Sequence, residues 1–172
     1  MSDQQIPPVS NPQSAPPLLS GGTPPHSSPP PVGQLPAPER RAGRAGRVLV
    51  AEDNPINRLV AAGLLQSLGY AVETVEDGRQ AVEAVGRERY DLVLMDVHMP
   101  ELDGFAATAA IRERERAAGG GRHVPIVALT ADALAGDAEK SRAAGMDDHL
   151  TKPVTLERLA AVLERWVRAE PE

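Results

Sequence analysis

Short apolar runs recur along the chain after residue 46, and each of them leads into polar residues. Residues 48–51, 92–95 and 126–129 are uninterrupted apolar runs, and residues 147–151 form a short, more polar strand candidate. Apolar runs of this length, without alternation, are typical of strands buried on both faces of a parallel sheet. The pattern therefore predicts a parallel sheet with these runs at its centre.

Segments with helical spacing separate the strands. Asn54-Pro55 is a helix-start signal, apolar or small residues follow at positions 56, 59, 60, 63, 64 and 68, and Gly69 ends the helix. The same patterns predict further strands over 70–75, 91–95 and 124–129. They also predict helices after the Asp77-Gly78 turn, before the glycine turn at 119–121, over 132–144 and over 156–167.

Five strands and five helices in strict alternation predict an α/β fold. We expect a doubly wound, five-stranded parallel sheet with helices on both faces. The flavodoxin-like strand order 2-1-3-4-5 accommodates five such units. In that order the first and third strands are neighbours, so Glu52 and Asp53 after the first lie beside Asp96 after the third.

These three acids form a candidate metal site. Adjacent carboxylates repel one another unless a cation lies between them, and Mg²⁺ commonly takes one or two carboxylates plus waters. We therefore expect Glu52, Asp53 and Asp96 to hold a divalent metal. The alternative is that the acids cap the following helix, a role that Asn54 can fill alone.

Asp96 is also a candidate nucleophile. A carboxylate can form a covalent phosphoryl intermediate when the charge of the transferring group is neutralised. Thr130 and Lys152 follow the fourth and fifth predicted strands, where a hydroxyl and an ammonium would reach a phosphoryl group, and Lys152 before Pro153 suits a cis bond in a tight turn. Singly, the three are a loop cap, an ordinary strand-end threonine and a surface lysine; only the combination points to phosphoryl chemistry.

Four segments carry a resemblance to a known family: AEDNPIN at 51–57, DLVLMDVHMPELDG at 91–104, ALTA at 128–131 and LTKP at 150–153. Through them residues 47–168 resemble a response-regulator receiver domain of two-component signalling. The sequence around 52–57 and 147–153 is most similar to that of receivers of hybrid sensor histidine kinases.

The resemblance implies a role for each site residue. Asp96 would accept a phosphoryl group from a phosphohistidine on a histidine kinase or a phosphotransfer protein. Mg²⁺ is the implied cofactor, with Asp53 and Asp96 as direct ligands, Glu52 acting through water and the backbone carbonyl of His98 as a further ligand. The remaining two residues, Thr130 and Lys152, would grip the phosphoryl group.

Two histidines leave alternatives open. Receivers usually carry Tyr or Phe three residues before the lysine, as a ring that rotates inward on activation, whereas His149 stands here, as in many hybrid-type receivers. His149 is therefore either part of the switch or an exposed edge residue. The ring of His98 would flank the path of an attacking water and influence phosphoryl lifetime, unless only its backbone matters.

The ends of the chain have a different composition. Residues 1–46 hold twelve of the seventeen prolines and almost no periodic apolar pattern, so we expect a disordered tail, with 169–172 as a short C-terminal tail. The stretch 29–31 is a semi-stiff spacer or a docking segment. The basic run 40–47 lacks aromatic residues, and from residue 47 on 22 acidic residues face 15 basic ones, so no nucleic-acid partner is expected.

Absent features narrow the class further. The chain has no cysteine, which excludes disulfides, thiolate zinc sites and a cysteine nucleophile. It shows no secretory signal pattern and no apolar stretch of the roughly 20 residues that span a bilayer. We therefore expect a cytoplasmic protein without a membrane segment.

The sequence predicts a single-domain response regulator: a phosphoacceptor module, not an enzyme, with no output domain after residue 168. Phosphorylation would change the face around 131–145 and 149–156 and act through a downstream partner, or the phosphoryl group would be passed on. One rival is a haloacid-dehalogenase-like phosphatase, which expects a second Asp where His98 stands and needs a substrate cap. The other is a scaffold that is never phosphorylated, against which the complete residue set argues.

Overall fold

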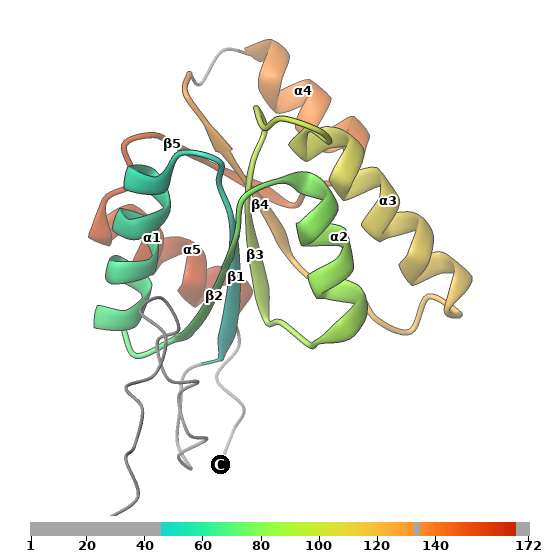
Figure 1. Cartoon of the computed structure of the whole chain (residues 1–172), viewed down its shortest axis with the longest axis horizontal. Helices are drawn as coiled ribbons and strands as arrows, with labels where there is room; N and C mark the ends of the chain where they lie inside the picture. Colours follow the sequence, from blue (N-terminus) through green and yellow to red (C-terminus); the bar gives the residue numbers. More distant parts are fainter. Residues whose placement is uncertain (1–45, 133–134, 168–172) are drawn as a thin grey trace, which may run out of the picture. The chain divides into compact units, whose positions relative to one another are not determined.

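Strands and helices alternate along the whole folded part of the chain (Figure 1). The computed structural model describes residues 46–132 and 135–167, so the predictions for the two tails lie outside the described residues, except for Gly46. The elements in order are β1 Arg47–Ala51, α1 Pro55–Ser67, β2 Ala71–Val75, α2 Gly78–Arg87, β3 Leu92–Asp96, α3 Gly104–Ala117, β4 Ile126–Thr130, α4 Ala135–Ala144, β5 Asp148–Thr151 and α5 Leu156–Trp166.

Local capping explains where several helices begin. The Asn54 side chain accepts hydrogen bonds from the amides of Ile56 and Asn57, and Pro55 occupies the first position of α1, as predicted. Asp77, Asp103 and Thr155 cap α2, α3 and α5 in the same way. The predicted helix over 132–144 is observed from Ala135, and residues 133 and 134 lie outside the described part.

The sheet has five parallel strands in the order β2-β1-β3-β4-β5, which confirms the predicted doubly wound topology. β3 and β4 are buried at every position, as uninterrupted apolar runs predict. Successive strand residues point to opposite faces, so Leu49 and Ala51 join one core cluster whereas Val48 and Val50 join the other.

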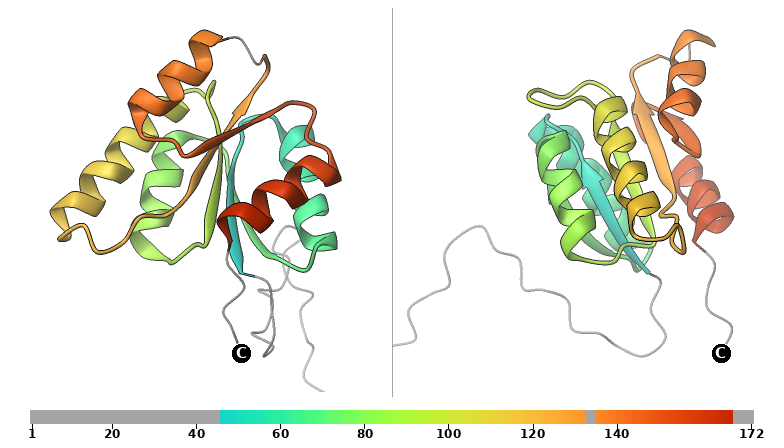
Figure 2. Two further views of the ribbon diagram at one scale, coloured as in Figure 1. Left: turned by 180° about the vertical axis from the view of Figure 1, so that it is seen from behind. Right: turned by 90° about the vertical axis from the view of Figure 1, so that its right-hand side faces the viewer.

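Helices cover both faces of the sheet (Figure 2). α1 and α5 pack on one face through Ala61, Leu65 and Leu159, and α2 and α3 pack on the other. α4 lies next to α3 and β5. The two layers leave the carboxyl edge of the sheet free to carry the loops that follow β1, β3, β4 and β5.

The apolar residues of α1 do not all face the core. Ala61 and Leu65 are the buried residues of this helix, whereas the side chains of Ile56 and Leu59 are 70% and 74% exposed. Helical spacing therefore located the helix correctly but did not distinguish its buried stripe from an exposed apolar surface. That surface lies in the first two turns, next to the loop that carries Glu52 and Asp53.

Candidate functional site

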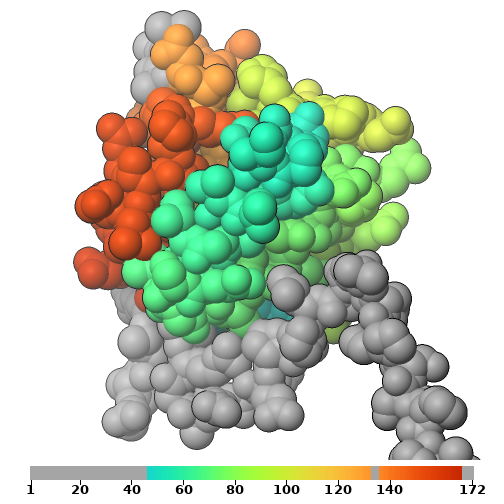
Figure 3. All heavy atoms as spheres, turned by 60° about the vertical axis from the view of Figure 1, so that its left-hand side comes forward, coloured from blue at the N-terminus to red at the C-terminus, as the bar shows by residue number. Residues whose placement is uncertain are grey.

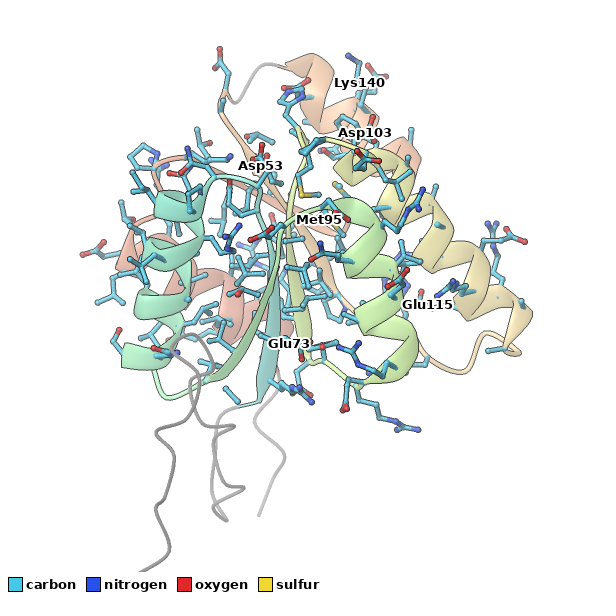
Figure 4. The ribbon with its side chains drawn as sticks, in the orientation of Figure 1. Asp53, Glu73, Met95, Asp103, Glu115 and Lys140 are labelled. Carbon is cyan, nitrogen blue, oxygen red and sulfur yellow. The ribbon has the colours of Figure 1, made fainter. Side chains whose placement is uncertain are left out.

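The strand register brings the predicted site residues to one edge of the sheet. Ala51 pairs with Met95, so the residues that follow β1 and the last residue of β3, Asp96, are neighbours. Thr130 is the last residue of β4 and pairs with Thr151, and Lys152 follows directly. Figure 4 shows Asp53 at this edge and Glu73, from the middle of β2, further down.

Three carboxylates form the centre of the site. Oxygens of Glu52, Asp53 and Asp96 all lie within 4.8 Å of one another. Glu52 and Asp96 are buried, at 1% and 2% exposure, and Asp53 is exposed. Two of these carboxylates are oriented by loop amides, since Asn54 N donates to Glu52 Oε1 at 3.2 Å and His98 N donates to Asp96 Oδ1 at 3.1 Å.

This donor set suits a hard divalent cation. Mg²⁺ prefers carboxylate oxygens and retains several waters, which one exposed and two buried acids on the edge of a sheet permit. Mutual repulsion between the acids would fall when such an ion binds. Among the described residues, these three are the ones that could together hold a metal ion.

Lys152 lies against the buried pair of acids. Its Nζ is 3.0 Å from Glu52 Oε2 and 3.1 Å from Asp96 Oδ2, and its side chain is 22% exposed. Burial opposes the charged ammonium, but hydrogen bonds and charge attraction to Glu52 and Asp96 outweigh it and raise the pKa of Lys152. The Lys152–Pro153 peptide bond is cis, as predicted.

Asp96 is a carboxylate held in a site that resists its charge. Burial raises its pKa to about 6, and the nearby charge of Glu52 acts in the same direction. The amide of His98 and the ammonium of Lys152 oppose this shift. With this pKa most of the Asp96 carboxylate is ionised at pH 7, the form that can act as a nucleophile.

Thr130 contributes a buried hydroxyl at the end of the neighbouring strand. The residue is 2% exposed, and Oγ1 has no hydrogen-bond partner among the described residues. Such a buried polar atom is costly in a folded protein unless a ligand or another group satisfies it. It fits a phosphoryl oxygen on Asp96.

The two histidines lie at the rim of the site. Both side chains are exposed, with His98 in the loop after β3 and His149 on β5. The His98 amide is used by Asp96, while the metal-binding role of its carbonyl and the roles of both rings stay predictions.

Two features of the site do not follow from the sequence pattern. Arg58, on α1, donates to the carbonyl oxygen of Glu52 at 2.8 Å and of Asp53 at 3.4 Å. Gly104 begins α3 so close to β3 that a Cβ there would overlap the Asp96 carbonyl oxygen. In the sequence Arg58 is a polar residue among the apolar ones of a helix, and Gly104 ends the segment 91–104. Neither contact can be read from these patterns, because both form only in three dimensions.

The fold and the site together define a class: a doubly wound α/β domain with an acidic pocket, a hydroxyl and an ammonium at the carboxyl edge of its sheet. Comparison with known proteins identifies that class. A model of the response regulator receiver domain family matches residues 48–164, and the chain belongs to this family.

Relatives place it among receivers of hybrid kinases. It is 49% identical over 127 residues to sensor protein GacS of Pseudomonas syringae pv. syringae, a match that covers 73% of this chain but 14% of that protein. The crystal structure of the receiver domain of sensor histidine kinase PA1611 from Pseudomonas aeruginosa PAO1 is 49% identical, with a TM-score of 0.64, and covers 72% of this chain and 98% of that one. The chain thus spans about a seventh of the GacS length.

Two matches bear on the cofactor and on partners. The PA1611 structure has a magnesium ion coordinated in its active site cleft, and the same ion is the cofactor that the three carboxylates fit here. The receiver domain of Ssk1, crystallised with the histidine phosphotransfer signalling protein Ypd1 of Saccharomyces cerevisiae, is 32% identical, with a TM-score of 0.65, and covers 70% of this chain and 88% of that one.

No helix in the described part of the chain is long and apolar enough to cross a membrane. The predicted cytoplasmic location and the expectation of no nucleic-acid partner stay predictions.

Proposed function

We propose that this chain is a Mg²⁺-dependent phosphoacceptor that takes a phosphoryl group from a phosphohistidine onto Asp96. An Oδ atom of Asp96 attacks phosphorus, the P–N bond breaks, its electron pair stays on the imidazole nitrogen, and an acyl phosphate remains on the chain. The single observation that carries the proposal is the burial of Asp96 within reach of two more carboxylates and an ammonium.

Each of the surrounding residues has a separate task. Glu52, Asp53 and Asp96, with the carbonyl of His98, would hold Mg²⁺, which supplies charge neutralisation to the phosphoryl oxygens. The ammonium of Lys152 would neutralise the new negative charge on the phosphoryl group. The hydroxyl of Thr130, which has no hydrogen-bond partner among the described residues, would donate to a phosphoryl oxygen. No separate base is needed, since the attacking carboxylate carries no proton.

The direct test is incubation with acetyl phosphate and Mg²⁺, followed by intact-mass measurement. We expect the mass gain of one phosphoryl group, its loss on treatment with hydroxylamine, and no gain with EDTA. Asp96→Asn is the matched control. A chain that stays unmodified under these conditions, or a modified Asp96→Asn variant, contradicts the proposal.

We also propose where the phosphodonor binds. The donor must bring its phosphorus to Asp96, so it must contact the rim of the site. Exposed apolar residues of α1 adjoin that rim, and we name them, with one residue of α5, the α1 patch. Figure 3 shows α1 on the surface of the molecule next to α5. Its residues are 40–74% exposed: Ile56, Leu59 and Val60 on α1, and Leu156 at the start of α5.

An apolar surface of this kind is suited to a helix of a protein partner. The yeast phosphotransfer protein Ypd1 is a precedent, because it was crystallised with a related receiver domain. We therefore assign the α1 patch to the histidine-bearing helix of a kinase or phosphotransfer protein. Docking there would position the phosphohistidine over Asp96 without any change in the chemistry.

A small-molecule donor separates docking from chemistry. We expect the double variant Ile56→Ser, Leu59→Ser to lose at least about tenfold in the rate of transfer from a phosphorylated phosphotransfer protein, the equivalent of about 1.4 kcal/mol. Its phosphorylation by acetyl phosphate should be unchanged. Gln66→Ser, an exposed position at the far end of α1, is the control. Equal transfer rates for all three chains would exclude the α1 patch.

We propose that the output is a protein contact or onward phosphotransfer. Thr130 is the last residue of β4, which precedes α4 in the chain, and His149 is exposed on β5. A shift of Thr130 toward a phosphoryl group would therefore change the surface made by α4, β5 and α5. Amide NMR shifts of that surface upon phosphorylation, compared between the native chain and His149→Ala, test whether His149 takes part. Identical shifts in both exclude a switching role for its ring.

A further inference from the structure

The guanidinium of Arg58 links three parts of the chain beside the acidic pocket. Nη1 donates to the carbonyl oxygens of Glu52 and Asp53, at 2.8 and 3.4 Å, and Nη2 donates to Glu76 Oε1 at 2.9 Å. Its side chain is only 17% exposed, whereas that of Glu76 is 66% exposed. Arg58 therefore ties the loop between β1 and α1 to the residue that follows β2.

That loop carries two of the three carboxylates. Three other contacts hold its acidic part: Glu52 N donates to the Val75 carbonyl at 3.1 Å, Asn54 N donates to the Glu52 side chain at 3.2 Å, and Lys152 Nζ lies 3.0 Å from Glu52 Oε2. Asp53 is exposed, and among the described residues the one hydrogen bond it makes is that which its carbonyl accepts from Arg58. The Glu52 carboxylate is also held by Asn54 N and Lys152 Nζ, whereas the backbone of both acids is held by Arg58.

The charge of Arg58 has the opposite effect on a metal ion. A guanidinium near the pocket repels a divalent cation, so removing it would strengthen Mg²⁺ binding if charge were its main contribution. Removing a group that orients metal ligands usually weakens binding instead. The sign of the change in Mg²⁺ affinity therefore separates the two roles.

We propose that Arg58 is a positioning residue for the metal site: it fixes the carbonyls of Glu52 and Asp53 so that both carboxylates face the ion. Orientation outweighs charge, because the guanidinium is directed at backbone carbonyls and at Glu76, away from the carboxylates of the pocket. The proposal rests on the Mg²⁺-dependent function proposed above and adds a residue that touches neither the ion nor the phosphoryl group.

The test is an NMR titration of the full chain with MgCl₂, which follows the amides of Asn54 and His98. Both amides donate to carboxylates of the pocket and so report on it directly. Arg58→Met removes the contacts. Arg58→Lys keeps the charge but has a single nitrogen in place of the two that reach the loop carbonyls and Glu76. Arg87→Met removes an arginine that pairs with Glu73 in the middle of β2, and is the matched control for charge.

We expect Arg58→Met to raise the Mg²⁺ dissociation constant about tenfold, in the range seen when groups that orient metal ligands are removed. Arg58→Lys should recover part of the loss, and Arg87→Met should stay within about twofold of the native value, as surface charges act weakly. Faster hydrogen exchange of the Asn54 amide in EDTA, in Arg58→Met alone, would report the loosened loop.

Other outcomes overturn the proposal. Unchanged or tighter Mg²⁺ binding in Arg58→Met would show that the position of the carboxylates does not depend on Arg58. If Arg58→Met lowers the melting temperature in EDTA but leaves the Mg²⁺ affinity unchanged, Arg58 has only a structural role. If the native chain itself fails to bind Mg²⁺ or to be phosphorylated by acetyl phosphate, the proposed function fails, and this result is distinct from the others.

Discussion

Lys152 Nζ lies 3.1 Å from Asp96 Oδ2, so the proposed phosphoacceptor is paired with a cation before any phosphoryl group arrives. The same ammonium is 3.0 Å from Glu52 Oε2. A phosphoryl group on Asp96 would bring its own negative oxygens to this ammonium. Lys152 is thus placed to exchange one anionic partner for another, which would couple the chemistry to the loop between β5 and α5.

Replacing Lys152 by Met should destabilise the chain at neutral pH. The variant leaves two carboxylates, those of Glu52 and Asp96, without their ammonium, and the pKa of Asp96 should rise further because Lys152 now lowers it. Loss of such charged hydrogen bonds costs about 1–3 kcal/mol in the free energy of unfolding. Urea unfolding at pH 7.5 in EDTA measures this loss, and added Mg²⁺ should reduce it. A variant as stable as the native chain would contradict the pairing.

The stability of the Mg²⁺-free chain should depend on the ionisation of Asp96. Its pKa is raised from 3.8 to about 6, so the folded state holds the proton more tightly than the unfolded state does. The tighter binding of this proton stabilises the folded state below pH about 4, and the stabilisation is lost as the pH rises through about 6. Asp96→Asn lacks the ionisation and should be more stable at pH 7.5 by roughly 1–3 kcal/mol.

Urea unfolding in EDTA between pH 4 and 8 checks this sign. The difference between Asp96→Asn and the native chain should grow as the pH rises and level off above pH about 7. A difference that stays constant across the range would mean that the site does not resist the charge of Asp96. Phosphorylation by acetyl phosphate should rise over the same range, because only the ionised carboxylate attacks.

Thr130→Val should separate stability from function. The variant keeps the branched shape but removes a buried hydroxyl that has no partner among the described residues. We expect the free energy of unfolding of the unphosphorylated chain to rise by about 1 kcal/mol, because an unsatisfied buried polar group is removed. Phosphorylated chain should accumulate less with acetyl phosphate. Thr130→Ser, which keeps the hydroxyl, is the control; if Val and Ser variants phosphorylate equally well, Thr130 does not bind the phosphoryl group.

His98→Asn should alter the lifetime of the acyl phosphate. The side chain of His98 is exposed, while its amide donates to Asp96, so a change of side chain alters the rim and leaves the backbone contact in place. The half-life of the phosphorylated chain after removal of acetyl phosphate measures the effect. An unchanged half-life would leave only the backbone of His98 with a role.

The pattern along the chain determined the topology and most of the site. Uninterrupted apolar runs such as 92–95 predicted buried parallel strands, and the alternation with helices predicted the doubly wound order. Because parallel strands end at a common edge, the order of the strands alone was enough to bring Glu52, Asp96 and Lys152 together. Rules of local capping also predicted the start of α1 at Pro55.

Only the tertiary structure decided which surfaces and contacts surround that site. Leu59 and Leu65 are equally apolar and both helical, yet one is exposed and one buried, because burial depends on which stripe of α1 meets the sheet. Arg58 reaches the loop and Glu76 across 18 residues of sequence, a contact that no local pattern encodes. The sequence by itself determined which groups meet at the carboxyl edge of the sheet, through the periodicity of strands and helices. Their distances, burial and orientation required packing, which sets them through long-range contacts.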